Sequence, residues 1–250
     1  MSSNSFSFNN TNNNLLILKE NFLNYKEEES SPINPSEYII SIDVWRANMV
    51  NWLSFLCNKL NFTEQTLFRS VSLFDQYISQ ISNEQALNLT QEKLSLITIA
   101  CLSLSTKLEE INCNYISFLN EKVLNSQNSK QFSNNDLTKM EFTILKALHY
   151  KTIYSTPLDF IEIYLEIFRN VLGLIDTLIE SQLISDIKSI SINLIKNNIN
   201  NIMYLTNSSS HLAYICFIQA LNQIRMMNSF HFKQIEKCIF TFDYQFTNIL

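Results

Sequence analysis

The side chains that most often bind metals or act as nucleophiles are scattered along this 250-residue sequence. Its three histidines, His149, His211 and His231, lie far apart and have no carboxylate at metal-ligand spacing. The adjacent carboxylates Glu109 and Glu110 would point about 100° apart on a helix, so we expect a solvated helix end and not a shared reacting centre. Because a Cys-x-x-Cys pair, a nucleophile elbow and an acidic metal cluster are also absent, we expect a protein without a catalytic site, metal or cofactor.

Four charged residues stand within or at the ends of strongly apolar segments, namely Arg46, Asp75, Lys107 and Glu141. Arg46 and Asp75 fall on two predicted neighbouring helices, so we expect an ion pair whose disruption would cost about 3–5 kcal/mol at full burial. We expect Lys107 at the C-terminus of its helix and Glu141 in the first turn of another, where the helix dipoles favour a cation and an anion. Unrelated surface charges, or charges that only complement these dipoles, are the alternative interpretations.

The composition predicts an all-helical protein. Hydrophobic residues make up 46% of the chain and charged residues 16%, which allows a sizeable core. A single glycine, Gly173, and three prolines exclude glycine-rich phosphate loops and disfavour a β-sandwich or barrel with its many turns. The net charge of −5 argues against a nucleic-acid binder, which would present a basic face.

We expect neither a membrane span nor a secretory signal. The apolar run at residues 94–106 is shorter than the about 20 residues that a span needs, and no basic region precedes an apolar stretch near residue 1. The cysteines lie far apart and mostly in apolar runs, as reduced core thiols would: Cys57, Cys101, Cys113, Cys216 and Cys238. This use of cysteine indicates the nucleus, the cytoplasm or both.

Polar breaks divide the chain into four parts. Residues 1–14 have no helical period and are predicted to be a disordered tail. Residues 15–42 are predicted to form a short N-terminal helix, over 15–29, and a linker that contains two prolines. Residues 43–152 and 153–250 are then predicted to form two helical bundles in tandem.

Helical periodicity and capping residues define the expected helices of each bundle. In the first bundle they cover residues 43–59, 63–81, 90–107, 115–124 and 136–149, with Asp43, Thr63, Thr90 and Asp136 as N-caps. In the second they cover residues 158–168, 172–199 (one helix or two), 211–227 and 232–246. One helix of each bundle, over 94–104 or 212–221, is apolar on all sides and is therefore expected at the centre.

Several of these residues resemble those of the cyclin family, and most of all those of cell-cycle cyclins of the A, B and D types. The resemblance rests on Arg46-Ala47 before Asn51-Trp52-Leu53, on the 29 residues from Arg46 to Asp75, on Lys107 and Glu141, and on Thr156-Pro157-Leu158-Asp159-Phe160. It implies an all-α cyclin fold with two five-helix bundles and an N-terminal helix. It also implies a non-catalytic regulatory subunit that binds and activates a cyclin-dependent Ser/Thr protein kinase in cell-cycle control. The alternative is a transcription-associated or scaffold protein of the same fold that activates no cell-cycle kinase.

The resemblance implies that Lys107 and Glu141 grip the kinase. Glu141, Leu145 and Leu148 share one face of a helix at i, i+4 and i+7. An apolar patch with a polar centre would suit a helix of a partner protein. The expected kinase-binding residues are Lys107, Leu108, Glu141, Leu145 and Tyr150.

Some cyclins also carry a shallow patch that binds substrate peptides. Its positions would fall here at Trp45, Asn48, Met49, Trp52, Phe55 and Ser95. Compared with those cyclins, Asn48 replaces an aliphatic residue, Phe55 an acidic residue and Ser95 a glutamine. We therefore expect an altered docking site, with Trp45, Met49, Trp52 and Phe55 as its candidate residues.

Residues Lys19-Glu20-Asn21 spell the tripeptide that marks mitotic cyclins for ubiquitin-dependent destruction. As a degron, this tripeptide would make a ubiquitin ligase a further partner. The alternative is a chance match in a chain rich in Lys, Glu and Asn. The tripeptide also falls within the predicted helix 15–29, whereas degrons work best unfolded.

Overall fold

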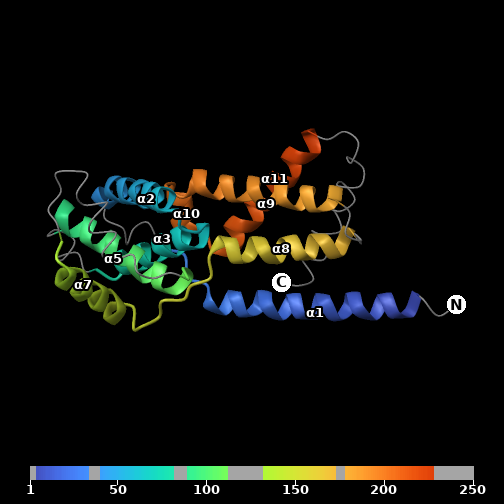
Figure 1. Cartoon of the computed structure of the whole chain (residues 1–250), viewed down its shortest axis with the longest axis horizontal. Helices are drawn as coiled ribbons and strands as arrows, with labels where there is room; N and C mark the ends of the chain where they lie inside the picture. The colour runs from blue at the N-terminus through green and yellow to red at the C-terminus, as the bar shows by residue number, and fades with distance from the viewer. Residues whose placement is uncertain (1–3, 34–39, 82–88, 112–131, 173–177, 228–250) are drawn as a thin grey trace. The chain divides into compact units, whose positions relative to one another are not determined.

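The computed structural model describes residues 4–33, 40–81, 89–111, 132–172 and 178–227. Within these ranges the regular elements are all helices, as the sequence predicts (Figure 1). The chain divides into two units, which are treated separately below. The central unit consists of residues 30–156 and 199–207, and the flanking unit of residues 1–29, 157–198 and 208–250.

The central unit is built around one buried helix. Its described helices are α2 (Ile40–Leu60), α3 (Glu64–Ser79), α5 (Gln91–Glu109), α7 (Asn134–Ala147) and α10 (Ile202–Thr206). Helix α5 packs against α2, α3 and α7, and its residues 97–106 are all buried, which confirms the expected central helix. Three of its buried hydroxyls donate to backbone carbonyls of the same helix, so they are satisfied inside the core: Thr98, Ser105 and Thr106.

Two of the predicted N-caps of this unit are confirmed and two are wrong. The side chains of Thr63 and Thr90 cap α3 and α5, each by accepting a backbone N–H three residues on. Helix α2 begins at Ile40, so Asp43 lies inside it. Helix α7 is capped by Ser133, and Asp136 completes a capping box by accepting the Ser133 N–H.

In the flanking unit, α11 is the central helix. The described helices of this unit are α1 (Asn4–Glu28), α8 (Pro157–Leu172), α9 (Leu178–Asn198) and α11 (Ser209–Met227). Helix α11 packs against α8 and α9, and α1 runs beside α8 in the opposite direction (Figure 1). Buried Phe22 of α1 contacts the rings of Phe160 and Tyr164 of α8. The start of α1 at Asn4 corrects the prediction of a disordered tail for residues 1–14, since residues 4–14 are helical.

A short segment from the second half of the sequence, residues 199–207, belongs to the central unit. Leu205 lies in the hydrophobic core of that unit, and its carbonyl accepts the N–H of Ile33 at 2.9 Å. The sequence analysis placed residues 199–207 in the second bundle, which it began at residue 153. It did not predict their place in the central unit, because a five-residue helix such as α10 has too few turns for a periodic pattern.

Some sequence predictions fall outside the described residues. They are the helices at 115–124 and 232–246, Cys113, His231 and Cys238. Among the helices that are described, none is long and apolar enough to cross a membrane. Nor do three His, Cys, Asp or Glu side chains gather in a metal-binding cluster within the same ranges.

Candidate functional site

Arg46 of α2 and Asp75 of α3 form a buried ion pair. The guanidinium donates from Nε to Asp75 Oδ1 and from Nη2 to Asp75 Oδ2, each at 2.8 Å, and the side chains are 2% and 4% exposed. Arg46 Nη1 donates to the Ile199 carbonyl at 2.9 Å, and the guanidinium carbon lies 5.8 Å from the centroid of the Tyr204 ring. This geometry makes the pair a buried structural connection between α2, α3 and residues 199–204.

Lys107 and Glu141 form a second pair that is open to solvent on one side. Lys107 Nζ donates to both carboxylate oxygens of Glu141 at 2.7 Å. The lysine side chain is 38% exposed, whereas the glutamate is 10% exposed. The pair is therefore partly exposed: Lys107 reaches solvent, while Glu141 is nearly buried and keeps its charge satisfied through the lysine.

The expected position of Glu141 is wrong, although that of Lys107 is confirmed. Lys107 lies in the last turn of α5, where the helix dipole favours a cation. Glu141 lies in the middle of α7, which begins at Asn134, so the dipole does not hold its charge. The ammonium group of Lys107 serves that purpose instead.

Apolar side chains that are exposed or half-buried lie close to this pair in the chain. We call Lys107, Leu108, Glu141, Leu145 and Tyr150 the docking patch; Leu108 and Tyr150 are exposed, and Leu145 is half-buried. Leu148, expected on the same surface, is buried in the core. The sequence analysis missed three exposed apolar residues that follow patch residues closely in the chain, namely Ile111, Phe142 and Ile153. The signal that could have identified them is their position, one to four residues after Lys107, Glu141 and Tyr150.

Two consecutive residues at the end of α7 have left-handed backbone conformations. His149 has a φ of 50° and Tyr150 a φ of 62°. The Tyr150 N–H donates to the Leu145 carbonyl at 2.7 Å and the His149 N–H to the Lys146 carbonyl at 3.2 Å, which is a Schellman motif. A non-glycine residue in this region costs about 1–2 kcal/mol. Such strain concentrates at functional sites, and here it presents the ring of Tyr150 to solvent.

Replacing His149 with glycine is expected to raise the free energy of unfolding by about 1 kcal/mol, because glycine adopts a φ of 50° without a steric penalty. Urea unfolding followed by circular dichroism would measure the change. His211→Gly is the matched control: His211 lies inside α11, where glycine should lower the stability by about 1 kcal/mol. If both substitutions destabilised equally, the left-handed conformation of His149 would carry no cost.

The candidate substrate-docking residues lie on α2. Trp45, Trp52 and Phe55 follow one another at helical spacing; the two tryptophans are half-buried and Phe55 is 54% exposed. Lys59 Nζ lies 5.7 Å from the centroid of the Phe55 ring. Met49 is buried in the core, so it supports this surface from beneath and does not line it.

Lys19, Glu20 and Asn21 lie within α1, as expected from the sequence. Glu20 and Asn21 are exposed, but the next residue, Phe22, is buried against α8. Glu29 directly follows α1, and its side chain accepts the backbone N–H of Ser210 at 2.6 Å. This hydrogen bond connects the end of α1 to the start of α11. The tripeptide is therefore helical and anchored on its C-terminal side.

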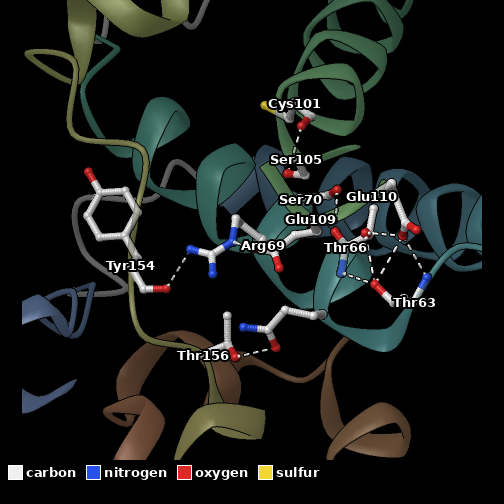
Figure 2. Close-up of polar contacts among 11 residues, drawn as sticks. Thr63, Thr66, Arg69, Ser70, Cys101, Ser105, Glu109, Glu110, Tyr154 and Thr156 are labelled. Atoms are coloured by element: carbon white, nitrogen blue, oxygen red, sulfur yellow. Dashed lines mark hydrogen bonds and ion pairs between the residues drawn. The ribbon is translucent and has the colours of Figure 1, made fainter. Parts of the chain in front are cut away.

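The carboxylates at the end of α5 were expected to be solvated, and the structure corrects this. Glu109 pairs with Arg69 of α3, and Glu110 accepts hydrogen bonds from Thr63 and Thr66 (Figure 2). Partial burial raises the pKa of the Glu110 carboxyl group, but the hydrogen bonds from these two threonines outweigh it and hold the pKa below its usual value. Both groups therefore serve as internal anchors beside the docking patch.

Comparison with protein families gives one match over more than half of the chain. Residues 20–153 match the family described as "Cyclin, N-terminal domain". The match spans the two ion pairs, the docking patch, and α2, α3, α5 and α7.

Individual cyclins are similar to part of this chain at 25–28% identity. Cyclin-B2-1 of Arabidopsis thaliana is 28% identical over 146 residues, which are 57% of this chain and 32% of that protein. G2/mitotic-specific cyclin-2 of Medicago sativa is 25% identical over 136 residues, 54% of this chain and 38% of that protein. The chain thus matches about a third of the length of these relatives. A solved viral cyclin from herpesvirus saimiri shares the fold, with a TM-score of 0.56, 18% identity and coverage of 94% of this chain and 98% of that one.

Proposed function

The chain belongs to the cyclin family, and on that premise we propose that it is the regulatory subunit that binds and activates a cyclin-dependent Ser/Thr protein kinase in cell-cycle control. Cyclins are regulatory and non-catalytic. The observation that carries the proposal is the Lys107–Glu141 pair, which is partly open to solvent and has exposed Leu108 and Tyr150 on the same two chain segments. We also propose that the protein acts in the nucleus or cytoplasm, and the buried thiols of Cys101 and Cys216, which form no disulfide, support a reducing compartment.

The mechanism that we propose is a shift in the conformational equilibrium of the kinase. A partner that binds the active conformation more tightly than the inactive one increases the active fraction. To move that equilibrium from 1:99 to 99:1, the partner must bind the active form about 10⁴-fold more tightly. In the docking patch, Leu108 and Tyr150 supply apolar area, while Lys107 and Glu141 supply donors and acceptors for the backbone groups of a kinase helix.

Affinity purification followed by a kinase assay tests the proposal. The tagged chain is used to capture protein kinases from a cell extract, and each captured kinase is then purified alone. We expect its phosphorylation of a Ser/Thr peptide to rise with added chain and to saturate. A kinase that binds without being activated would instead favour the scaffold function, and failure to capture any kinase would contradict both the binding and the activation.

A standard Arg-x-Leu peptide is expected not to bind the α2 surface measurably at tens of micromolar. Covering the exposed amide of Asn48 without a hydrogen-bond partner would cost about 1–3 kcal/mol. Phe55 offers no carboxylate to the peptide arginine, which removes a hydrogen bond worth about 1.5–3 kcal/mol. At about 1.4 kcal/mol per factor of ten, these losses weaken binding about a hundredfold or more.

Fluorescence polarisation with a labelled peptide measures this affinity. The double variant Asn48→Leu with Phe55→Glu restores the aliphatic and acidic side chains on an exposed face, so it should gain binding. Low-micromolar binding by the unaltered chain, abolished by Trp52→Ala, would show that the surface works despite its substitutions.

A further inference from the structure

Arg69 of α3 connects two chain segments that lie far apart in the sequence. Its side chain is 8% exposed, and its Nε donates to the carboxylate of Glu109. Its Nη1 donates to the backbone carbonyl of Tyr154 at 3.1 Å. Figure 2 shows the guanidinium between these two acceptors, Glu109 at the end of α5 and Tyr154 on the segment after α7. A buried guanidinium requires such partners, so the three groups are fixed relative to one another.

Both acceptors are next to exposed apolar residues of the site. Glu109 directly follows Leu108 of the docking patch, and Tyr154 directly follows exposed Ile153. Between α7 and Tyr154 the chain also carries Tyr150, whose ring is exposed. Arg69 therefore holds together the two segments that present the apolar part of the docking patch.

Other residues in the first two turns of α3, and its N-cap, reinforce both ends of this connection. Glu110 Oε1 accepts the Thr63 N–H at 2.8 Å and the Thr66 hydroxyl at 2.5 Å. The Thr156 hydroxyl donates to the Gln65 side chain at 3.0 Å, two residues beyond Tyr154 (Figure 2). Residues 63–69 thus form hydrogen bonds with both segments.

We propose that Arg69 is a positioning residue for kinase binding, which sets the separation of the α5 end from the segment after α7 without touching the kinase. This inference rests on the proposed function. An interface gains affinity when its side chains are already held in the bound arrangement, because less conformational freedom is lost on association. Lys107 has a long flexible stem, and the position of its backbone depends on the turn of α5 that Glu109 completes.

Kinase affinity tests the proposal through non-additivity. We expect Arg69→Met to weaken binding of the captured kinase at least tenfold, whereas in a Lys107→Ala background the same substitution should weaken it less than twofold. Arg169→Met, which removes the exposed partner of Glu166 in the flanking unit, is the matched control and should change affinity less than twofold. If Arg69→Met weakened kinase binding by the same factor with and without Lys107→Ala, the proposal would be overturned. A general loss of stability would weaken binding equally in both backgrounds.

A measurement without kinase separates this inference from the proposed function. Acetylation of Lys107 Nζ, followed by mass spectrometry, reports how firmly Glu141 holds the amine. We expect Arg69→Met to accelerate labelling of Lys107 severalfold and to leave exposed Lys59 and Lys93 unchanged. If the variant fails to fold, Glu109→Gln, which keeps Arg69 and its bond to Tyr154, should show the same selective effect. Unchanged labelling of Lys107 would overturn the inference, whereas selective labelling in a chain that captures no kinase would contradict the proposed function alone.

Discussion

Replacing Asp75 with alanine is expected to lower the free energy of unfolding of the central unit by about 3–5 kcal/mol. The substitution would leave the Arg46 guanidinium with 2% exposure and without the carboxylate that accepts two of its hydrogen bonds. The Ile199 carbonyl and the Tyr204 ring would remain, but neither carries a charge that compensates the guanidinium. Because a domain is typically stable by only about 5–15 kcal/mol, this loss is a large part of the total.

Urea unfolding monitored by circular dichroism would measure this loss. Lys93→Ala, which removes a charge from an exposed position of α5, should change the stability by less than about 0.5 kcal/mol. A double-mutant cycle with Arg46→Met and Asp75→Ala should give a coupling energy above about 1 kcal/mol. Additive losses would mean that the two side chains do not meet.

The parts of the fold that sequence predicts well are those encoded within one helical turn or one helix. Thr63 and Thr90 predict the starts of α3 and α5. A threonine just before a segment with helical apolar spacing can accept a free backbone N–H of the first turn. The central position of α5 follows from its lack of a polar face, which leaves no side suited to water. The cyclin fold was predictable only from a resemblance carried by several short motifs together, among them Arg46 and Asp75, which pair across adjacent helices.

The parts that escaped prediction depend on contacts between residues far apart in the sequence. Arg69 and Tyr154 are separated by 85 residues, and Glu110 and Thr63 by 47, so no local pattern relates them. In the same way, residues 199–207 are held in the central unit by long-range contacts, such as the hydrogen bond from the Arg46 guanidinium to the Ile199 carbonyl 153 residues away. Glu141 was misplaced for a related reason: its charge is held by Lys107 of another helix and not by the start of its own.

Replacing Lys107 with glutamate is expected to abolish co-purification of the kinase. The change removes the donor of the docking patch and puts a second carboxylate beside Glu141, whose oxygens now lie 2.7 Å from the lysine Nζ. Like charges placed together at an interface cost several kcal/mol, and about 3 kcal/mol already corresponds to roughly a hundredfold loss of affinity. The helical circular dichroism should stay unchanged, because Lys107 is 38% exposed and the loss of one partly exposed pair is smaller than the about 5–15 kcal/mol by which a domain is stable.

Two further variants separate recognition of the kinase from the intramolecular pair. Lys139→Glu makes the same charge change at an exposed position of α7 and should leave co-purification intact. The double variant Lys107→Glu with Glu141→Lys restores opposite charges across the pair. It also exchanges their roles, so that position 107 accepts hydrogen bonds and position 141 donates them. If the patch binds fixed donors and acceptors of the kinase backbone, this swap must fail to restore co-purification, because the backbone cannot reverse its polarity. Retained kinase in Lys107→Glu would refute the docking patch, and full recovery in the swapped variant would mean that the pair acts only within the cyclin.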